Sequence, residues 1–206
     1  MADALLIFKP DASYRLAPRA GLWGWLASER DWKIESLTWF QPPALLIESH
    51  YDFLRGRPFF PWLVDFMTAL PLLVGRVTAS AEALERMRHD LGETRIVQSR
   101  PGSLRERYGI FGGVNCLHLS DSAETGAAEV EKWSKSVQLS EISVNLPTGS
   151  NQPDHTYRLR SLATQVNAGH HVELASQTIR ELIAEETDLD GKRLEALWRV
   201  ILGALV

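Results

Sequence analysis

Short apolar runs alternate with stretches of helical spacing along most of this chain, and this alternation limits the folds open to it. The runs typical of strands cover residues 4–8, 32–40, 71–77 and 116–119. The stretches of helical spacing cover residues 21–30, 44–54, 60–67, 81–89 and 123–133. Ser80 and Ser122 are good N-caps for the last two of these helices. A turn-like stretch leads up to Pro18 and Arg19, and residues 91–108 form one long irregular loop. This alternation predicts a layered α/β (α+β) domain.

The composition is that of an ordinary globular protein and excludes several classes. Of the 206 residues, 45% are hydrophobic and 23% are charged, and the net charge of −4 gives no reason to expect nucleic-acid binding. The one cysteine, Cys116, excludes an intramolecular disulfide and a multi-cysteine zinc site. The first residues lack a signal-peptide pattern, and no apolar run approaches membrane-spanning length. We therefore expect a cytoplasmic protein that binds neither nucleic acid nor membrane.

The stretch that carries the chemistry is residues 105–129, RERYGIFGGVNCLHLSDSAETGAAE. It places His118 in an apolar run between a glycine-rich approach and a serine/aspartate cluster, and a helix carrying Glu129 follows. One interpretation is a buried strand with a satisfied core histidine, which is the commoner fate of a lone histidine. The other is an imidazole held by a carboxylate and activated as a nucleophile. Spacing alone does not choose between them.

This stretch closely resembles the active-site segment of nucleoside diphosphate kinases, whose N-x-x-H-x-S-D-S pattern is matched by residues 115–122. Further segments follow in family order: LLIFKPDA with Lys9, HYDFLRGRPFFPWLVDFM with Tyr51 and Phe59, then Arg88, LGET with Thr94, and RPGSLRERYG with Arg105. Several separated motifs in the correct order are far more specific than any one of them. The resemblance covers residues 3 to 133 and implies a ferredoxin-like four-stranded antiparallel sheet with helices on one face. It also implies a homo-oligomer (dimer, tetramer or hexamer) with the loop over residues 91–108 packed between subunits.

The resemblance further implies a catalytic set, which consists of His118, Lys9, Glu129, Ser120 and Tyr51. His118 would carry the phosphoryl group, Glu129 would accept a hydrogen bond from its other ring nitrogen, and Ser120 would join them. Asp121 would hold Mg²⁺ through water, because magnesium keeps several waters and binds mainly to nucleotide phosphates. The other histidines, including His50 and His89, are expected on the surface.

The same resemblance implies a nucleotide-binding set for nucleoside triphosphates and diphosphates. Its cations are Lys9, Arg88 and Arg105, which would neutralise phosphate charge. Its polar and aromatic members are Tyr51 and Thr94 near the phosphates, Asn115 at the ribose and Phe59 stacked on the base.

Several positions depart from the family pattern. Leu119 replaces a glycine, so a bulky side chain is expected beside the reacting imidazole. Gly112 replaces an apolar residue across the base from Phe59, and Val114 replaces an arginine just before Asn115. None of these changes removes a catalytic group, but each bears on rate, affinity or nucleotide preference.

The C-terminal extension, residues 134–206, has no counterpart in the family pattern. Residues 134–169 are polar and turn-rich, with NLPTGSNQPD typical of a linker or extended arm. Two amphipathic helices are predicted over residues 172–186 and 191–206. This helical hairpin must cover the catalytic domain, a neighbouring subunit or another protein, so we expect two parts, residues 1–133 and 134–206.

The sequence therefore predicts a nucleoside diphosphate kinase-like phosphotransferase. It would move the γ-phosphate of a nucleoside triphosphate to a nucleoside diphosphate by a ping-pong mechanism through a phosphohistidine. The alternative is a nucleotide-binding regulatory or interaction protein with low turnover, which the departures and the new C-terminus favour. The complete polar set favours the enzyme.

Overall fold

A computed structural model describes residues 1–28, 31–146 and 151–205 of the chain. Its strands are β1 (Ala2–Phe8), β2 (Trp32–Phe40), β3 (Leu72–Ala79) and β4 (Leu117–Leu119). Its helices up to the end of the resemblance are α1 (Pro10–Tyr14), α2 (Leu16–Ala27), α3 (Ala44–His50), η1 (Asp52–Leu54), α4 (Phe60–Thr68), α5 (Ala81–Leu91), η2 (Ile96–Gln98), α6 (Leu104–Tyr108) and α7 (Ala123–Ser134). The C-terminal extension adds α8 (Thr156–Asn167), α9 (Val172–Glu185) and α10 (Gly191–Gly203).

The four strands form one antiparallel sheet in the order β2-β3-β1-β4, which confirms the predicted fold class. The central strand β1 pairs with β3 along its whole length and with β4 at its end, where Ile7 lies opposite His118. This pairing brings the end of β1, and therefore Lys9, next to the short strand that carries the histidine.

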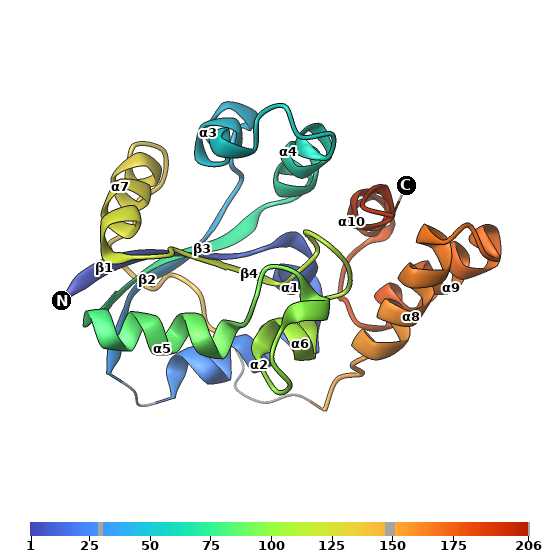
Figure 1. Cartoon of the computed structure of the whole chain (residues 1–206), viewed down its shortest axis with the longest axis horizontal. Coiled ribbons are helices and arrows are strands. Elements are labelled where there is room, and N and C mark those ends of the chain that lie inside the picture. The colour runs from blue at the N-terminus through green and yellow to red at the C-terminus, as the bar shows by residue number, and fades with distance from the viewer. Residues whose placement is uncertain (29–30, 147–150, 206) are drawn as a thin grey trace.

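Helices cover both faces of this sheet, so the expectation of helices on one face is wrong. Helices α3, α4 and α7 lie over one face, and α2, α5 and α6 lie over the other (Figure 1). Successive side chains of a strand point to opposite faces, and accordingly Leu5 and Ile7 belong to one apolar cluster while Leu6 and Phe8 belong to the other. The unbroken apolar run of β1 is the sequence signal for this double coverage.

Two stretches expected to be irregular contain helices. The stretch leading to Pro18 holds α1 and the start of α2, because Pro10 can occupy the first helical position without losing a needed hydrogen bond. The predicted helix over residues 21–30 thus begins earlier, at Leu16, and its last two residues lie outside those the structure describes. The loop over residues 91–108 contains η2 and α6.

The extension contains three helices rather than two. Helix α8 was missed because the polar residues before it dominate the composition, although its buried Leu159, Ala163 and Val166 have helical spacing. Asp154, just before the N-cap residue His155, accepts from the Thr156 backbone N–H at 3.0 Å. Of the predicted linker NLPTGSNQPD, residues 147–150 lie outside the described part, and so does Val206 at the end of the last predicted helix.

The extension packs on the rest of the same chain. Helix α8 lies against α9 and α6, and α10 lies against α4 (Figure 1). Leu197 and Ile201 of α10 share one apolar cluster with Phe60 and Leu63 of α4. This apolar cluster contains residues from both sides of the predicted boundary at residue 133. The division of the chain into two parts at that residue therefore stays a prediction.

Candidate active site

The imidazole of His118 is held by Glu129, which is held in turn by Ser120. Its Nε2 lies 3.0 Å from Glu129 Oε2 on α7, and the Ser120 hydroxyl donates to the same oxygen at 2.5 Å. Ser120 is fixed in turn, because its Oγ accepts from the Leu5 backbone N–H at 2.8 Å. A carboxylate can only accept, so Nε2 carries the proton and Nδ1 is the unprotonated nitrogen that can attack.

The start of α7 places Glu129 where it can do this. The Ser122 side chain accepts from the Thr125 backbone N–H, and the Thr125 hydroxyl accepts from the Ser122 backbone N–H. This capping box fixes the helix start, and Glu129 lies two turns further on. Desolvation raises the pKa of Glu129, but the hydrogen bonds from His118 and Ser120 and the electrostatic interactions with His118 and His50 outweigh it and lower the pKa to about 2. Glu129 is therefore ionised at neutral pH.

His50 is a member of this group that the sequence interpretation missed. It was expected on a helical surface, but it is buried with only 6% of its area exposed. Its ring centre lies 4.6 Å from that of His118 at 80°, and its Nδ1 accepts from Trp133 Nε1 at 3.1 Å. One sequence signal could have predicted its burial in the site: it is the last residue of α3 and directly precedes Tyr51, which was assigned to the site.

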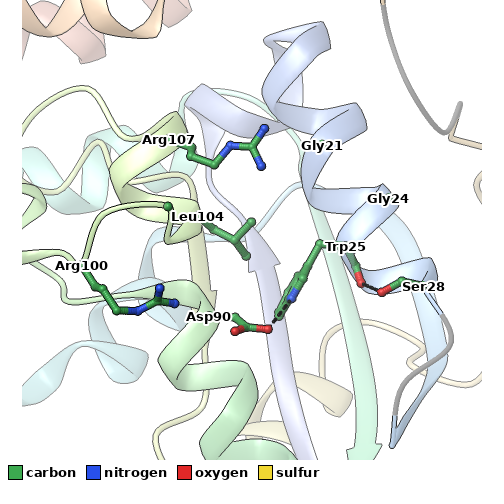
Figure 2. A pocket seen from close by; sticks show the side chains of 9 residues that line it. Gly21, Gly24, Trp25, Ser28, Asp90, Arg100, Leu104 and Arg107 are labelled. Atoms are coloured by element: carbon green, nitrogen blue, oxygen red, sulfur yellow. Dashed lines mark hydrogen bonds between the residues drawn. The ribbon is translucent and has the colours of Figure 1, made fainter.

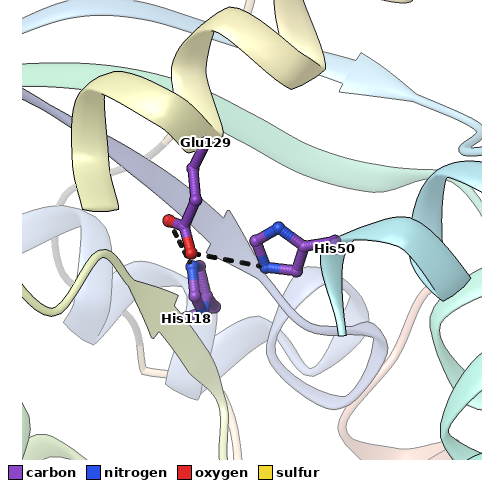
Figure 3. A group of neighbouring side chains, drawn as sticks. All are labelled: His50, His118 and Glu129. Atoms are coloured by element: carbon purple, nitrogen blue, oxygen red, sulfur yellow. Dashed lines mark hydrogen bonds and ion pairs between the residues drawn. The ribbon is translucent and has the colours of Figure 1, made fainter. Parts of the chain in front are cut away.

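The three side chains His50, His118 and Glu129 form a cluster with the spacing of a metal site, as Figure 3 shows. Hydrogen bonding argues against that use. An indole N–H can only donate, so His50 Nδ1 must accept and its proton must sit on Nε2, the nitrogen that faces Glu129 at 3.9 Å. Burial, followed by the electrostatic interaction with His118, lowers the pKa of His50 to about 3, which keeps it neutral. His50 is thus an uncharged neighbour, and its Nε2 lies too far from Glu129 to compete with the hydrogen bond between Glu129 and His118.

Lys9, Asn115, Thr94 and Arg105 are joined in one network. Lys9 Nζ donates to Asn115 Oδ1 at 2.7 Å and to the Gly113 carbonyl at 3.1 Å. Asn115 Nδ2 donates to the Thr94 carbonyl at 2.9 Å. Arg105 donates to the Thr94 hydroxyl at 3.3 Å and to the Leu117 carbonyl at 2.9 Å, next to His118 in sequence. Both cations are therefore held by uncharged oxygens, and within the described residues neither forms an ion pair with a carboxylate.

Two buried polar atoms in this region lack a hydrogen-bond partner within the described residues, namely Tyr51 Oη and Arg105 Nε. The Tyr51 ring lies 6.2 Å from the His118 ring, and burial raises its pKa, so it keeps its proton and can donate. A buried donor without an acceptor costs about 1–3 kcal/mol. A phosphate oxygen next to His118 would supply the acceptor.

Arg88 and Asp121 lie at the exposed side of the site. Arg88 donates to the Leu119 carbonyl at 2.8 Å and pairs with Asp121 at 2.6 Å, and the Asp121 side chain is 75% exposed. A phosphate would therefore compete with Asp121 for the guanidinium. Phe59 is the N-cap residue of α4 and is 47% exposed, as suits a platform for a ligand ring.

The structure corrects the expectation for Leu119. Its side chain was expected beside the imidazole, but it is fully buried in the apolar cluster of Leu6 and Phe8, on the sheet face opposite to Leu5 and Ile7. Strand alternation sends the neighbour of His118 to the opposite face. Gly112 has φ +50° and open space where a side chain would stand, and Val114 is buried.

A separate hollow of about 370 Å³ lies between α2, α5 and the segment around α6 (Figure 2). Its lining includes Trp25, Asp90, Arg100 and Arg107, and Trp25 Nε1 donates to Asp90 Oδ2 at 3.1 Å. It shares no lining residue with the His118 group, and we assign no role to it.

The charge of Lys9 gives a testable pH dependence. Burial, then the charge of Arg105, lowers its pKa from 10.5 to about 8, so Lys9 is cationic below that pH and neutral above it. A neutral amine does not attract phosphate, so we expect kcat/KM to fall as pH rises through about 8, by up to ~10-fold per pH unit. Burial raises the pKa of Tyr51 and, with the charge of Asp11, raises that of Cys116 to about 12, so neither should produce this fall.

The control is Lys9→Arg, because arginine keeps its charge over this range. The variant should be less active overall but should lose the fall between pH 7.5 and 9.5. An unchanged fall in Lys9→Arg would assign the titration to another group.

Comparison with known proteins gives one family. The nucleoside diphosphate kinase family model matches residues 3–139. A nucleoside diphosphate kinase of Carboxydothermus hydrogenoformans is 33% identical over 151 residues, covering 72% of this chain and 97% of that protein. One from Chloroflexus aurantiacus is 36% identical over 132 residues, covering 63% and 84%. Among solved structures, that of nucleoside diphosphate kinase from Encephalitozoon cuniculi is 28% identical with a TM-score of 0.58, covering 65% of this chain and 88% of that one. The matched residues end before α8, so α8, α9 and α10 lie outside them.

Proposed function

Because this chain belongs to the nucleoside diphosphate kinase family and is a phosphotransferase of that kind, we propose that His118 is the residue that carries the phosphoryl group between nucleotides. The observation that carries this assignment is the hydrogen bond from Nε2 to Glu129, which leaves Nδ1 free of its proton.

The reaction then has two half-reactions. His118 Nδ1 attacks the γ-phosphorus of a nucleoside triphosphate, the N–P bond forms, and the bond to the β,γ-bridging oxygen breaks so that the diphosphate leaves with the electron pair. A terminal oxygen of the acceptor diphosphate next attacks the same phosphorus, and the N–P bond electrons return to Nδ1. The proton on Nε2 stays in its hydrogen bond throughout, and ionised Glu129 stabilises the positive charge on the ring.

We propose roles for the surrounding groups from the family resemblance, and their charges and contacts support these roles. Lys9, Arg105 and Arg88 neutralise the charge that spreads over the transferring phosphoryl oxygens. The Tyr51 hydroxyl and Arg105 Nε, which lack partners within the described residues, gain phosphate acceptors. Thr94 donates near the phosphates, Asn115 binds the ribose, Phe59 stacks on the base, and Ser120 keeps Glu129 in place.

The family uses a divalent metal such as Mg²⁺, and the residues here fit a metal held mainly by nucleotide phosphates. Asp121 is an exposed carboxylate at the phosphate side of the site, already paired with Arg88, which suits contact through a bound water better than direct ligation. When bound, Mg²⁺ supplies further neutralisation of phosphate charge.

The proposal extends to the assembly and the location of the chain. The family forms oligomers in general, and we infer a homo-oligomer here, a dimer, tetramer or hexamer, tested by light scattering. A single buried cysteine is compatible with the cytoplasm, where we propose that the enzyme acts. Over residues 1–28, 31–146 and 151–205, no helix combines the length and apolar character needed to cross a bilayer.

The direct test uses ATP labelled in the γ-phosphate. With Mg²⁺ present, the pure protein should become labelled, the label should be lost in acid and kept in alkali, and an added diphosphate should remove it. Absence of labelling under these conditions would overturn the assignment of His118.

The base site predicts weak discrimination among nucleotides. An exposed Phe59 ring with the open space at Gly112 offers stacking and no hydrogen-bond readout of the base. Apolar contacts alone discriminate by about 10–200-fold. We therefore expect kcat/KM for four different diphosphate acceptors to lie within that range, and Phe59→Ala to lower all four alike. A preference above about a thousandfold would require a polar readout that this site does not offer.

A further inference from the structure

The indole of Trp62 on α4 lies between the C-terminal helix α10 and a glycine turn of the nucleotide site. Its Nε1 donates to the Val200 carbonyl of α10 at 2.7 Å. A Cβ atom added at Gly203, the last residue of α10, would lie 3.0 Å from Trp62 Cδ1. A Cβ atom added at Gly113 would lie 2.9 Å from Trp62 Cζ3, at the opposite edge of the ring. The ring therefore fills the space between two glycines, one in the extension and one in the turn.

The turn at Gly113 is part of the nucleotide site. Residues Phe111 and Val114 close it with backbone hydrogen bonds of 2.8 and 3.3 Å. The Gly113 carbonyl accepts from Lys9 Nζ, and Asn115, two residues on, accepts from the same nitrogen. Movement of this turn would change where Lys9 and Asn115 present their polar atoms.

Helix α10 is itself held firmly. Asp190 caps its start by accepting from the Arg193 backbone N–H at 3.0 Å, and the Arg193 side chain donates to the Tyr14 hydroxyl at 3.3 Å. Leu197 and Ile201 are buried against the rest of the chain. Trp62 is also stacked on Phe66, with ring centres 5.2 Å apart and planes at 14°. The ring is thus held by α10 and by Phe66, and its far edge lies against the turn at Gly113.

We propose that Trp62 is a positioning residue through which the C-terminal extension fixes the glycine turn, and with it Lys9 and Asn115, for nucleotide binding. This inference rests on the proposed function, since it concerns the same nucleotide site. It assigns the extension a role in substrate affinity, although the extension supplies none of the groups assigned to substrate binding or catalysis.

The test measures the Kd of Mg-ADP for the full chain by titration calorimetry, together with KM and kcat. Trp62→Ala removes the hydrogen bond to Val200 and the ring that lies against Gly113. Substitutions between two coupled sites change ligand affinity by about 2- to 30-fold. We expect Kd and KM to rise by about 10-fold within that range, with a smaller change in kcat. Trp62→Phe keeps a ring against Gly113 but loses the hydrogen bond to Val200, and should give a smaller rise.

The second variant approaches the same contact from the extension, in case Trp62→Ala unfolds. In Gly203→Ala the new methyl group pushes the indole towards Gly113, so Kd should rise by about 2- to 10-fold. Its matched control is Gly191→Ala at the other end of α10, where an added Cβ meets nothing within 4 Å and Kd should not change.

The outcomes separate this inference from the function it rests on. If the wild type binds ADP and forms the phosphohistidine while Trp62→Ala and Gly203→Ala bind ADP as it does, the role of Trp62 is overturned and the function stands. An equal rise in Gly203→Ala and Gly191→Ala would also overturn it, because the effect would then belong to the helix and not to the ring. A wild type that binds no nucleotide would remove both proposals.

Discussion

His118→Ala should abolish the labelled phosphoprotein and reduce phosphotransfer by on the order of 10⁴-fold or more, as loss of a covalent nucleophile does elsewhere. The reason is structural. The hydrogen bond from Nε2 to Glu129, whose lowered pKa keeps it ionised, selects the tautomer of the neutral imidazole in which Nδ1 has the free lone pair. Lys9 and Arg105 would remain and still attract nucleotide, so the Kd of Mg-ADP should change little while turnover disappears.

The matched control is His89→Ala, which removes a histidine whose side chain is 67% exposed. It should keep wild-type labelling and turnover. Stable, acid-labile labelling of His118→Ala would mean that another residue carries the phosphoryl group, and His50 would be the next to test because its ring lies beside that of His118.

The sequence was most informative where a residue could be matched to a motif, and least informative where contacts join distant segments. The matched Lys9, Asn115, Thr94 and Arg105 lie in one hydrogen-bonded network. The prediction that His50 lies on the surface was wrong because its burial depends on a contact with Trp133, 83 residues later. Helical spacing around His50 does not predict that contact. The pairing of residues so far apart is set by the folded sheet and helices, which single-sequence patterns do not specify.

Other differences had a signal that was given too little weight. The side chain of Leu119 had to point away from that of His118, because neighbours in a strand face opposite sides. The apolar spacing of Leu159, Ala163 and Val166 was present within a segment interpreted as an arm. Arg15 and Glu186 form a buried ion pair, and no pattern in the sequence predicts it. Glu186 lies 171 residues after Arg15, in the C-terminal extension that has no counterpart in the family pattern.

Glu186→Gln should destabilise the protein by about 3–5 kcal/mol, because it removes the fully buried carboxylate and leaves the buried Arg15 guanidinium with the partly exposed Asp154, 3.6 Å away. Both side chains are fully buried, and Arg15 donates to Glu186 through Nε and, at 3.2 Å, through a terminal nitrogen. The same guanidinium donates to the Thr156 hydroxyl at 2.6 Å and to the Tyr108 carbonyl at 3.1 Å, so the pair joins the extension to α1 and α6. For a chain of this size the loss corresponds to a fall in Tm of about 6–20 °C.

The matched control is Glu195→Gln, which removes the same charge from a half-exposed pair with Arg180 at 2.9 Å. Exposed pairs contribute about 0–1 kcal/mol, so Tm should change by no more than a few degrees. Arg15→Met combined with Glu186→Leu should recover much of the stability lost in Glu186→Gln, because replacing both members of the buried pair also removes the guanidinium that has lost its buried partner. Equal losses in Glu186→Gln and Glu195→Gln would contradict the buried attachment of the extension. A double variant as unstable as Glu186→Gln would instead show that the hydrogen bonds to Thr156 and Tyr108, and not the guanidinium without its buried partner, account for the loss.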